Sequence, residues 1–220
     1  VQVGTMALRG AIAGTVGAAI EWESAMTGVA KTVDASETEL AALGKQFISM
    51  SERIPVSANA LAGLAEVAGQ LGIQTENIAS FAEVTAKLGA ATNLSAEDAA
   101  VGLARFSNIV GTSQDDIGKL GAAIVDLGNS YATTESEILE MSLRLAGAGR
   151  QVGLSEGDIL GLAASLTSVG INAEAGGTAF SRVMAEMAQR AGEGEEAIAG
   201  MAEVVGLTAA EFRDLVASSP

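Results

Sequence analysis

The residues of this chain that could carry chemistry are paired carboxylates and Gly-Lys steps. Three pairs place two acids side by side, as an acid–base pair or a cation site would require: Glu97-Asp98, Asp115-Asp116 and Glu195-Glu196. The chain has no His and no Cys, which removes the commonest bases, nucleophiles and transition-metal ligands. Gly44-Lys45 and Gly118-Lys119 lack the Ser or Thr that follows lysine in a phosphate-binding loop. We therefore expect no catalytic residue, no metal and no cofactor, and predict that the protein is not an enzyme.

Acidic residues mark the starts of helices instead. A Ser or Thr followed three residues later by Glu or Asp forms a capping box, in which the two side chains satisfy free N–H groups of the first helical turn. Five pairs have this spacing: Ser36 with Glu39, Ser95 with Asp98, Thr134 with Glu137, Ser155 with Asp158, and Thr208 with Glu211. Between them apolar residues recur at intervals of three, four and seven, and no window alternates with a period of two. The sequence therefore predicts an all-α protein, a multi-helix array of capped amphipathic helices behind a long N-terminal helix.

The best-defined pair of helices is predicted between Leu154 and Arg190. Residues 159–173 contain no charge although 18% of the chain is charged, so we expect a buried helix there. Its stripe consists of apolar residues at helical spacing: Ile159, Leu162, Ala163, Leu166 and Val169. Gly170-Ile171 is typical of a helix end, because glycine adopts the left-handed conformation at no steric cost.

A second helix is expected to begin at Asn172, with two adjacent glycines near its start. Gly176-Gly177 would weaken a helix unless another backbone has to come close. We expect this close contact to be made with the small residues 163–165 of the preceding helix.

The run from Gly161 to Met184, GLAASLTSVGINAEAGGTAFSRVM, resembles the core region of the tail tape measure proteins of long-tailed bacteriophages. In that family a helix, a Gly-Ile turn and an AGGTA-type helix start occur in this order. The similarity continues back through residues 127–159 and, more faintly, to an aromatic residue followed by Glu. The positions that carry it are Trp22, Glu23, Gly153, Gly170, Ile171, Gly176, Gly177 and Thr178.

The resemblance implies a structural and assembly protein. Tape measure proteins are long helical chains that lie in the lumen of the tail tube, set tail length during assembly and leave ahead of the DNA at genome ejection. Their implied partners are the tail tube, the tail tip and tail assembly chaperone proteins. The implied locations are the virion tail and, during assembly, the host cytoplasm, with membrane contact only at ejection.

Charge argues against direct binding of nucleic acid. The chain has 27 acidic and 12 basic residues, a net charge of −15, and no cluster of Lys and Arg that could replace the counterions of a phosphate backbone. Hydrophobic residues make up 49% of the chain but aromatic residues only 3%, so the core is built from small side chains. Such a thin core favours self-association.

A long helix is predicted from Thr5 to about Asp34. Its uncharged run, residues 11–20, is much shorter than the roughly 20 residues that span a bilayer, which favours a helix contact in water over membrane insertion. Gly10, Gly14 and Gly17 would let identical helices approach closely. We expect association into a trimer or a hexamer through this helix, because the domain behind it is too small to cover the whole apolar stripe.

Three segments are predicted: a long helix at 1–35, a helical core domain at 36–192, and a joint with short helices at 193–220 that leads into the rest of a longer chain. Helix order and Gly-apolar turns also suggest two three-helix repeats, 57–111 and 134–191. The alternative is that the same end signal is used repeatedly without duplication, since Gly followed by an apolar residue ends many helices.

A different class of function also fits the sequence. The thin core and the uncharged run would suit a helical interaction module unrelated to phage, or a membrane-active helical protein. Hundreds of further helical residues in the flanking sequence would favour the tape measure.

Overall fold

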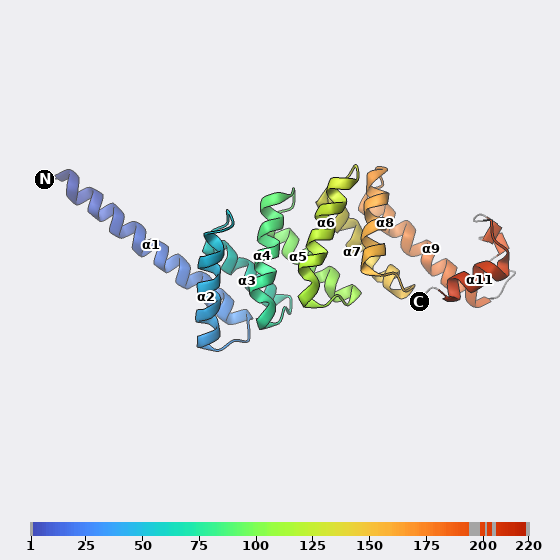
Figure 1. Ribbon diagram of the computed structural model, residues 1–220, viewed down its shortest axis with the longest axis horizontal. Helices are drawn as coiled ribbons and strands as arrows, with labels where there is room; N and C mark the ends of the chain where they lie inside the picture. The colour runs from blue at the N-terminus through green and yellow to red at the C-terminus, as the bar shows by residue number, and fades with distance from the viewer. Residues whose placement is uncertain (1, 194–198, 201, 204–205, 219–220) are drawn as a thin grey trace. The chain divides into compact units, whose positions relative to one another are not determined.

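The computed structural model describes residues 2–193, 199–200, 202–203 and 206–218, which contain helices and no strand. The fold is all-α, as predicted (Figure 1). The helices are α1 (Gln2–Thr32), α2 (Glu37–Ser51), α3 (Ala58–Gln70), α4 (Ile78–Ala91), α5 (Ala96–Val110), α6 (Ile117–Ser130), α7 (Glu135–Gln151), α8 (Glu156–Ser168), α9 (Ala173–Glu193) and α11 (Ala209–Ser218). Two 3-10 turns, η1 (Thr75–Asn77) and η2 (Gln114–Asp116), precede α4 and α6.

Four of the five predicted capping boxes make both of their bonds, and at the fifth Ser95 accepts the Asp98 N–H (3.0 Å). Ser36, Thr134 and Ser155 each accept the N–H of the acidic residue three positions on, whose carboxylate accepts the cap's own N–H. Thr208 and Glu211 make the same two bonds, at 3.3 and 2.9 Å. Each box satisfies backbone donors that the first turn of a helix leaves without a partner. The sequence thus determines where these helices begin.

Helix ends are equally regular. All the described residues with positive φ are glycines: Gly72, Gly111, Gly153, Gly170 and Gly206. In each case the N–H of the next residue bonds to the carbonyl five positions back, as Ile73 does to Ala68 (3.0 Å) and Ile171 to Leu166 (3.1 Å). This is the Schellman motif, which needs a left-handed residue that glycine provides without strain.

The caps and ends follow a spacing that defines helical hairpins. The caps of α3, α5, α7, α9 and α11 succeed one another at intervals of 38, 39, 38 and 36 residues: Ser57, Ser95, Thr134, Asn172 and Thr208. Three hairpins, α3–α4, α5–α6 and α7–α8, share a first helix ended by a left-handed glycine, a short link and a second helix. The three-helix division into 57–111 and 134–191 stays a prediction beside this two-helix pattern.

The chain forms two compact units. Unit 1 comprises Val1–Ala104 and Gln114–Gly121, and α3 packs there on α1, α2 and α4. The largest fully buried side chains of unit 1 are Phe47, Leu61, Leu64, Ile78, Phe81 and Leu103. Unit 2 comprises Arg105–Ser113 and Ala122–Pro220, and α7 packs there on α8 and α9. Its largest fully buried side chains are Phe106, Ile124, Ile138, Met141, Leu145 and Ile159. The predicted segments 1–35, 36–192 and 193–220 stay a prediction.

The uncharged helix predicted to be buried is amphipathic. α8 buries one face, Ile159, Leu160, Ala163, Ala164 and Thr167, and ends at Ser168. Val169, expected on the buried stripe, is 73% exposed, because it caps α8 where the chain leaves the helix. Beyond Asp158 the exposed face has no charged residue, but it includes polar ones such as Ser165. The Ser165 hydroxyl donates to the Gly161 carbonyl of the same helix (2.8 Å). The absence of charge was therefore a poor guide to burial.

The N-terminal helix begins slightly earlier than predicted. α1 runs from Gln2 to Thr32, and side-chain surroundings are described from Gly17 onward. Val29 and Val33 are buried, whereas Ile20 is 61% exposed. No helix among the described residues is long and apolar enough to cross a membrane.

Candidate interaction surfaces

The two carboxylate pairs that the structure describes do not gather into a site. Glu97 and Asp98 are exposed in the first turn of α5, where they complement the helix dipole. Asp116 pairs with Lys119 (2.7 Å), and Glu195-Glu196 lie outside the described residues. Across the described parts of the chain, no group of three acidic side chains is placed to hold a metal ion.

Electrostatic perturbation is concentrated at the helix starts. The backbone N–H of Ser36, helped by its hydroxyl, lowers the pKa of Glu39. The hydroxyl groups of the other caps are the main cause at three further carboxyls, lowering the pKa of Glu137 beside Thr134, of Asp158 beside Ser155 and of Glu211 beside Thr208. A hydrogen bond to the charged form favours ionisation. These perturbed groups hold helix ends in place, and their chemistry is structural.

Hydrogen bonds join the links of successive hairpins in unit 1. Thr75, in the link between α3 and α4, donates its hydroxyl hydrogen to the carbonyl of Asp34, between α1 and α2 (2.9 Å). Gln114, in the next link, makes two bonds with the α3–α4 link. Its amide Nε2 donates to the Gly72 carbonyl (3.1 Å), and its Oε1 accepts the Gln74 N–H (2.7 Å). One side chain thus binds two backbone groups of its neighbour and fixes how the two links align.

Unit 2 has a corresponding contact. Thr112, in the α5–α6 link, donates its hydroxyl hydrogen to the Glu156 carboxylate at the start of α8. Within unit 1 the hydrogen bonds therefore join links to one another, and within unit 2 the bond of Thr112 joins a link to the start of a helix.

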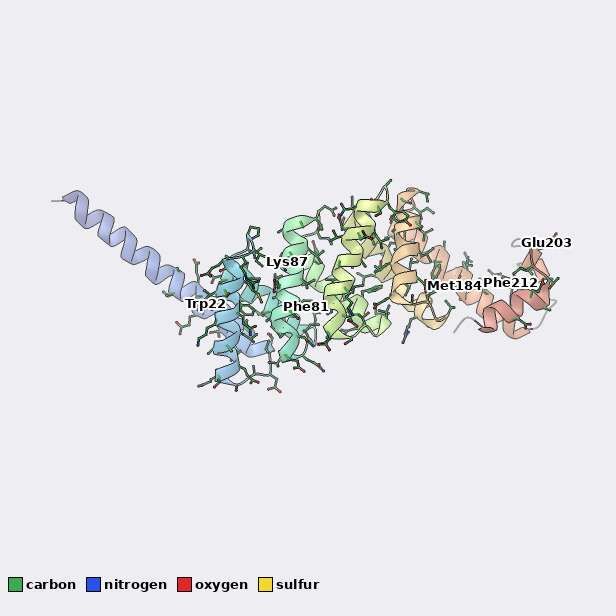
Figure 2. All side chains as sticks on the ribbon, viewed as in Figure 1. Trp22, Phe81, Lys87, Met184, Glu203 and Phe212 are labelled. Atoms are coloured by element: carbon green, nitrogen blue, oxygen red, sulfur yellow. The ribbon has the colours of Figure 1, made fainter. Side chains whose placement is uncertain are left out.

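Trp22 lies in an open groove between α1 and α2. The groove has a volume of about 650 Å³. Its lining is mainly apolar: Ala19, Trp22, Met26 and Ala30 from α1, and Leu40, Ala41, Gly44 and Ile48 from α2. Glu23 and Lys45 also line it. Figure 2 shows Trp22 on α1 where that helix passes α2, and a Cβ on Gly44 would lie 3.2 Å from the indole carbon Cζ2. The aromatic–Glu pair singled out in the sequence thus lines a concave, largely apolar surface.

A different face of α1 packs on α3. A Cβ on Gly28 would lie 2.2 Å from the carboxylate of Glu66, and a Cβ on Gly69 would lie 2.7 Å from the Thr32 carbonyl oxygen. Gly10, Gly14 and Gly17 are 18, 14 and 11 residues before Gly28, so helical periodicity places them on this same face. A Cβ on Gly17 would meet nothing within 4 Å. The surroundings of Gly10 and Gly14 lie outside the described side chains.

Gly176 and Gly177 are buried and make a close helix contact. A Cβ on Gly176 would lie 2.7 Å from the Met141 methyl carbon, and one on Gly177 would lie 2.5 Å from the Arg144 Cβ. Both neighbours are on α7. The predicted partner, residues 163–165 of α8, was therefore wrong, because α9 lies along the first helix of the preceding hairpin.

The opposite side of α9 is open. Thr178 lines a shallow hollow there with neighbours from the same helix: Asn172, Glu174, Ala175, Ala179, Arg182 and Val183. Ile171, 38% exposed, follows Gly170 at the end of α8, as Leu154 follows Gly153 at the end of α7. The motif residues of the sequence thus lie in three places: the groove, the helix ends, and α9.

Sequence reasoning missed the links as contact points. Thr75, Thr112 and Gln114 stand in polar segments that look like ordinary loops. A signal was nevertheless present in the sequence, because three of the five left-handed glycines are followed six residues later by isoleucine: Gly72 and Ile78, Gly111 and Ile117, Gly153 and Ile159.

Comparison of the sequence with models of known protein families finds a match. The sequence model of a family described as phage-related minor tail protein matches residues 44–218. This range includes the three hairpins and α9 and leaves α1, with Trp22 and Glu23, outside. No curated protein and no solved structure matches the chain.

Proposed function

Because the chain belongs to the family of phage-related minor tail proteins, we propose that it is a segment of the tail tape measure protein of a long-tailed phage. In this role it lies in the lumen of the tail tube, sets tail length during assembly in the host cytoplasm, and leaves ahead of the DNA at ejection. The family supports a structural role in the phage tail and favours it over a helical module unrelated to phage. The finer assignment rests on the order of the motifs around Gly170 and Gly176.

The observation that carries the proposal is the regular succession of capped hairpins. Caps separated by 36 to 39 residues divide much of the chain into similar units, from Ser57 to Thr208. In repeat proteins each unit contacts mainly its neighbours, so the extent of the array follows the number of units. A protein that sets a length needs this proportionality between residues and distance.

The net charge supports a place in the tube. At −15, the chain is repelled by DNA that follows it through the same conduit, and it has no basic cluster that would retain the genome. The proposed partners are further copies of the chain, the tail tube, the tail tip and a tail assembly chaperone. Membrane contact is confined to ejection.

Deleting a hairpin tests the proposal. Removing residues 57–94, from one cap to the residue before the next, should leave the remaining caps and ends intact. Virions that carry this deletion should have shorter tails in electron micrographs, and removal of 57–133 should shorten them by about twice as much, as expected for additive repeats.

The control is Gln74→Ala, which alters a link residue whose backbone alone bonds to Gln114. This variant should give tails of normal length. Assembled virions whose tails keep their full length after both deletions would rule out a length-setting role for this segment.

A further inference from the structure

We propose that the first half of α1 is an arm that docks into the α1–α2 groove of a second copy, in an antiparallel pair that exchanges arms. The proposal specifies the contact between copies named among the proposed partners. It concerns the isolated chain, so its failure would leave the length-setting role untouched.

The apolar residues of the arm lie on the same side of α1 as the residues that line the groove. At 100° per residue, Leu8, Ile12 and Val16 fall within about 120° of one another together with the groove-lining residues Ala19, Trp22 and Met26. The stripe therefore continues along one side of α1 out of the groove and into the arm. At the groove, α3 packs on a different face of α1, the one that bears Gly28 and Thr32.

The groove is suited to receive a helix. Its lining is apolar apart from Glu23, Thr27 and Lys45, and Ile48 on its α2 wall is 48% exposed. Residues 10–20 of α1, from the arm to the edge of the groove, contain no charge. The groove itself is a concave apolar surface of the kind that marks a protein interaction site.

An antiparallel arrangement makes the two features complementary. With Leu8 of one copy opposite Met26 of the other, Ile12 comes opposite Trp22 and the pair is centred near Gly17, with an overlap of about 27 Å. Each arm then lies in the other copy's groove. Such a contact uses the same surface twice and closes as a dimer, whereas a parallel arrangement with the same stagger would continue indefinitely.

Charge also favours this register. Arg9 is the only charged residue before Glu21, and it follows the stripe on the same edge as Glu23. In a two-fold antiparallel pair, the edge of the stripe that bears Arg9 and Glu23 lies on the same side of the contact in both copies. Arg9 of one copy therefore comes beside Glu23 of the other. The carboxylate on the groove wall thereby gains an opposite charge.

Trp22 provides a direct readout, because it is the only tryptophan. As the concentration of the 220-residue chain rises, sedimentation should show a monomer–dimer transition. Trp22 emission should move to shorter wavelength and become protected from a soluble quencher over the same range. Ile48→Glu on the groove and Ile12→Glu on the arm should each weaken dimerisation at least about tenfold, because each places a charge in the apolar contact.

Ile109→Glu is the matched control. Ile109 of α5 is 44% exposed, close to the 48% of Ile48, and does not line the groove. This variant should dimerise like the unaltered chain. If Ile48→Glu and Ile109→Glu have equal effects, or if Trp22 stays accessible to quencher at all concentrations, the proposal is overturned.

Engineered cysteines establish the orientation, since the chain has none of its own. Leu8→Cys alone and Met26→Cys alone should give no disulfide-linked dimer on oxidation, whereas a mixture of the two variants should. Cross-linking of Leu8→Cys with itself would show a parallel bundle, such as a trimer of arms, and would contradict the antiparallel pair.

Discussion

At the scale of single residues, the carboxylates of the capping boxes couple stability to pH. The pKa values of Glu39, Glu137, Asp158 and Glu211 are lowered in the folded chain because caps donate hydrogen bonds to the ionised form. A group with a lowered folded pKa contributes stability above its unfolded pKa and loses it as pH falls through the folded value. The glutamates should therefore lose their contribution below their ordinary pKa of 4.5.

We expect the melting temperature, followed by circular dichroism, to fall progressively from about pH 5 to about pH 3. A variant with Glu39→Gln, Glu137→Gln and Glu211→Gln should melt lower near neutral pH and depend less on pH over the acidic range. If this variant keeps the pH dependence of the unaltered chain, groups other than the caps are responsible.

Gly177 is a second residue whose effect is set by its immediate surroundings. Gly177→Leu places a large side chain where even a Cβ would come 2.5 Å from Arg144, so it should cost about 1 to 3 kcal/mol in the free energy of unfolding. Urea denaturation measures this change. Gly147→Leu is the control, because a Cβ at that position of α7 meets nothing within 4 Å. Equal urea midpoints for the two variants would mean that the α7–α9 contact accommodates the leucine without loss of stability.

At the scale of elements, the links hold successive hairpins in register. Gln114→Ala removes both bonds to the α3–α4 link, whereas Gln114→Glu keeps an acceptor for the Gln74 N–H and loses only the donor to the Gly72 carbonyl. We expect the Gln74 amide to exchange with solvent faster in Gln114→Ala and to remain protected in Gln114→Glu. Hydrogen exchange followed by NMR distinguishes these outcomes, and unchanged protection in both variants would show that another group shields this amide.

The sequence predicts helix boundaries better than helix neighbours, for a physical reason. Caps such as Ser155 with Asp158, and ends such as Gly170, depend on residues within a few positions of one another, so local chemistry determines them. The partner of Gly176 and Gly177 depends on which helix lies opposite, and a stripe of small residues is compatible with both α7 and α8. Its helical spacing puts Trp22 on the apolar stripe of the N-terminal helix, but nothing in that spacing reveals the α2 wall of the groove.

At the scale of the whole molecule, charge opposes compactness. A net charge of −15 on 220 residues creates repulsion that folding increases, because it brings the charges closer together. Raising ionic strength from about 0.01 M to about 0.15 M shortens the Debye length from about 30 Å to about 8 Å and screens this repulsion. We expect the melting temperature to rise over this range with either sodium or potassium chloride, and a fall would show that attractive ion pairs dominate instead.

The bonds between links differ in what they require of the neighbouring sequence. Gln114 and Thr75 bind only backbone groups, at Gly72, Gln74 and Asp34, and every amino acid supplies such carbonyls while all but proline supply the N–H. Thr112 instead binds the Glu156 side chain. The bonds of Gln114 and Thr75 can therefore persist when the sequence of the partner segment changes. The bond of Thr112 requires residues 112 and 156 to change together. Homologous chains should diverge freely at positions 74 and 34 and show paired substitution at 112 and 156.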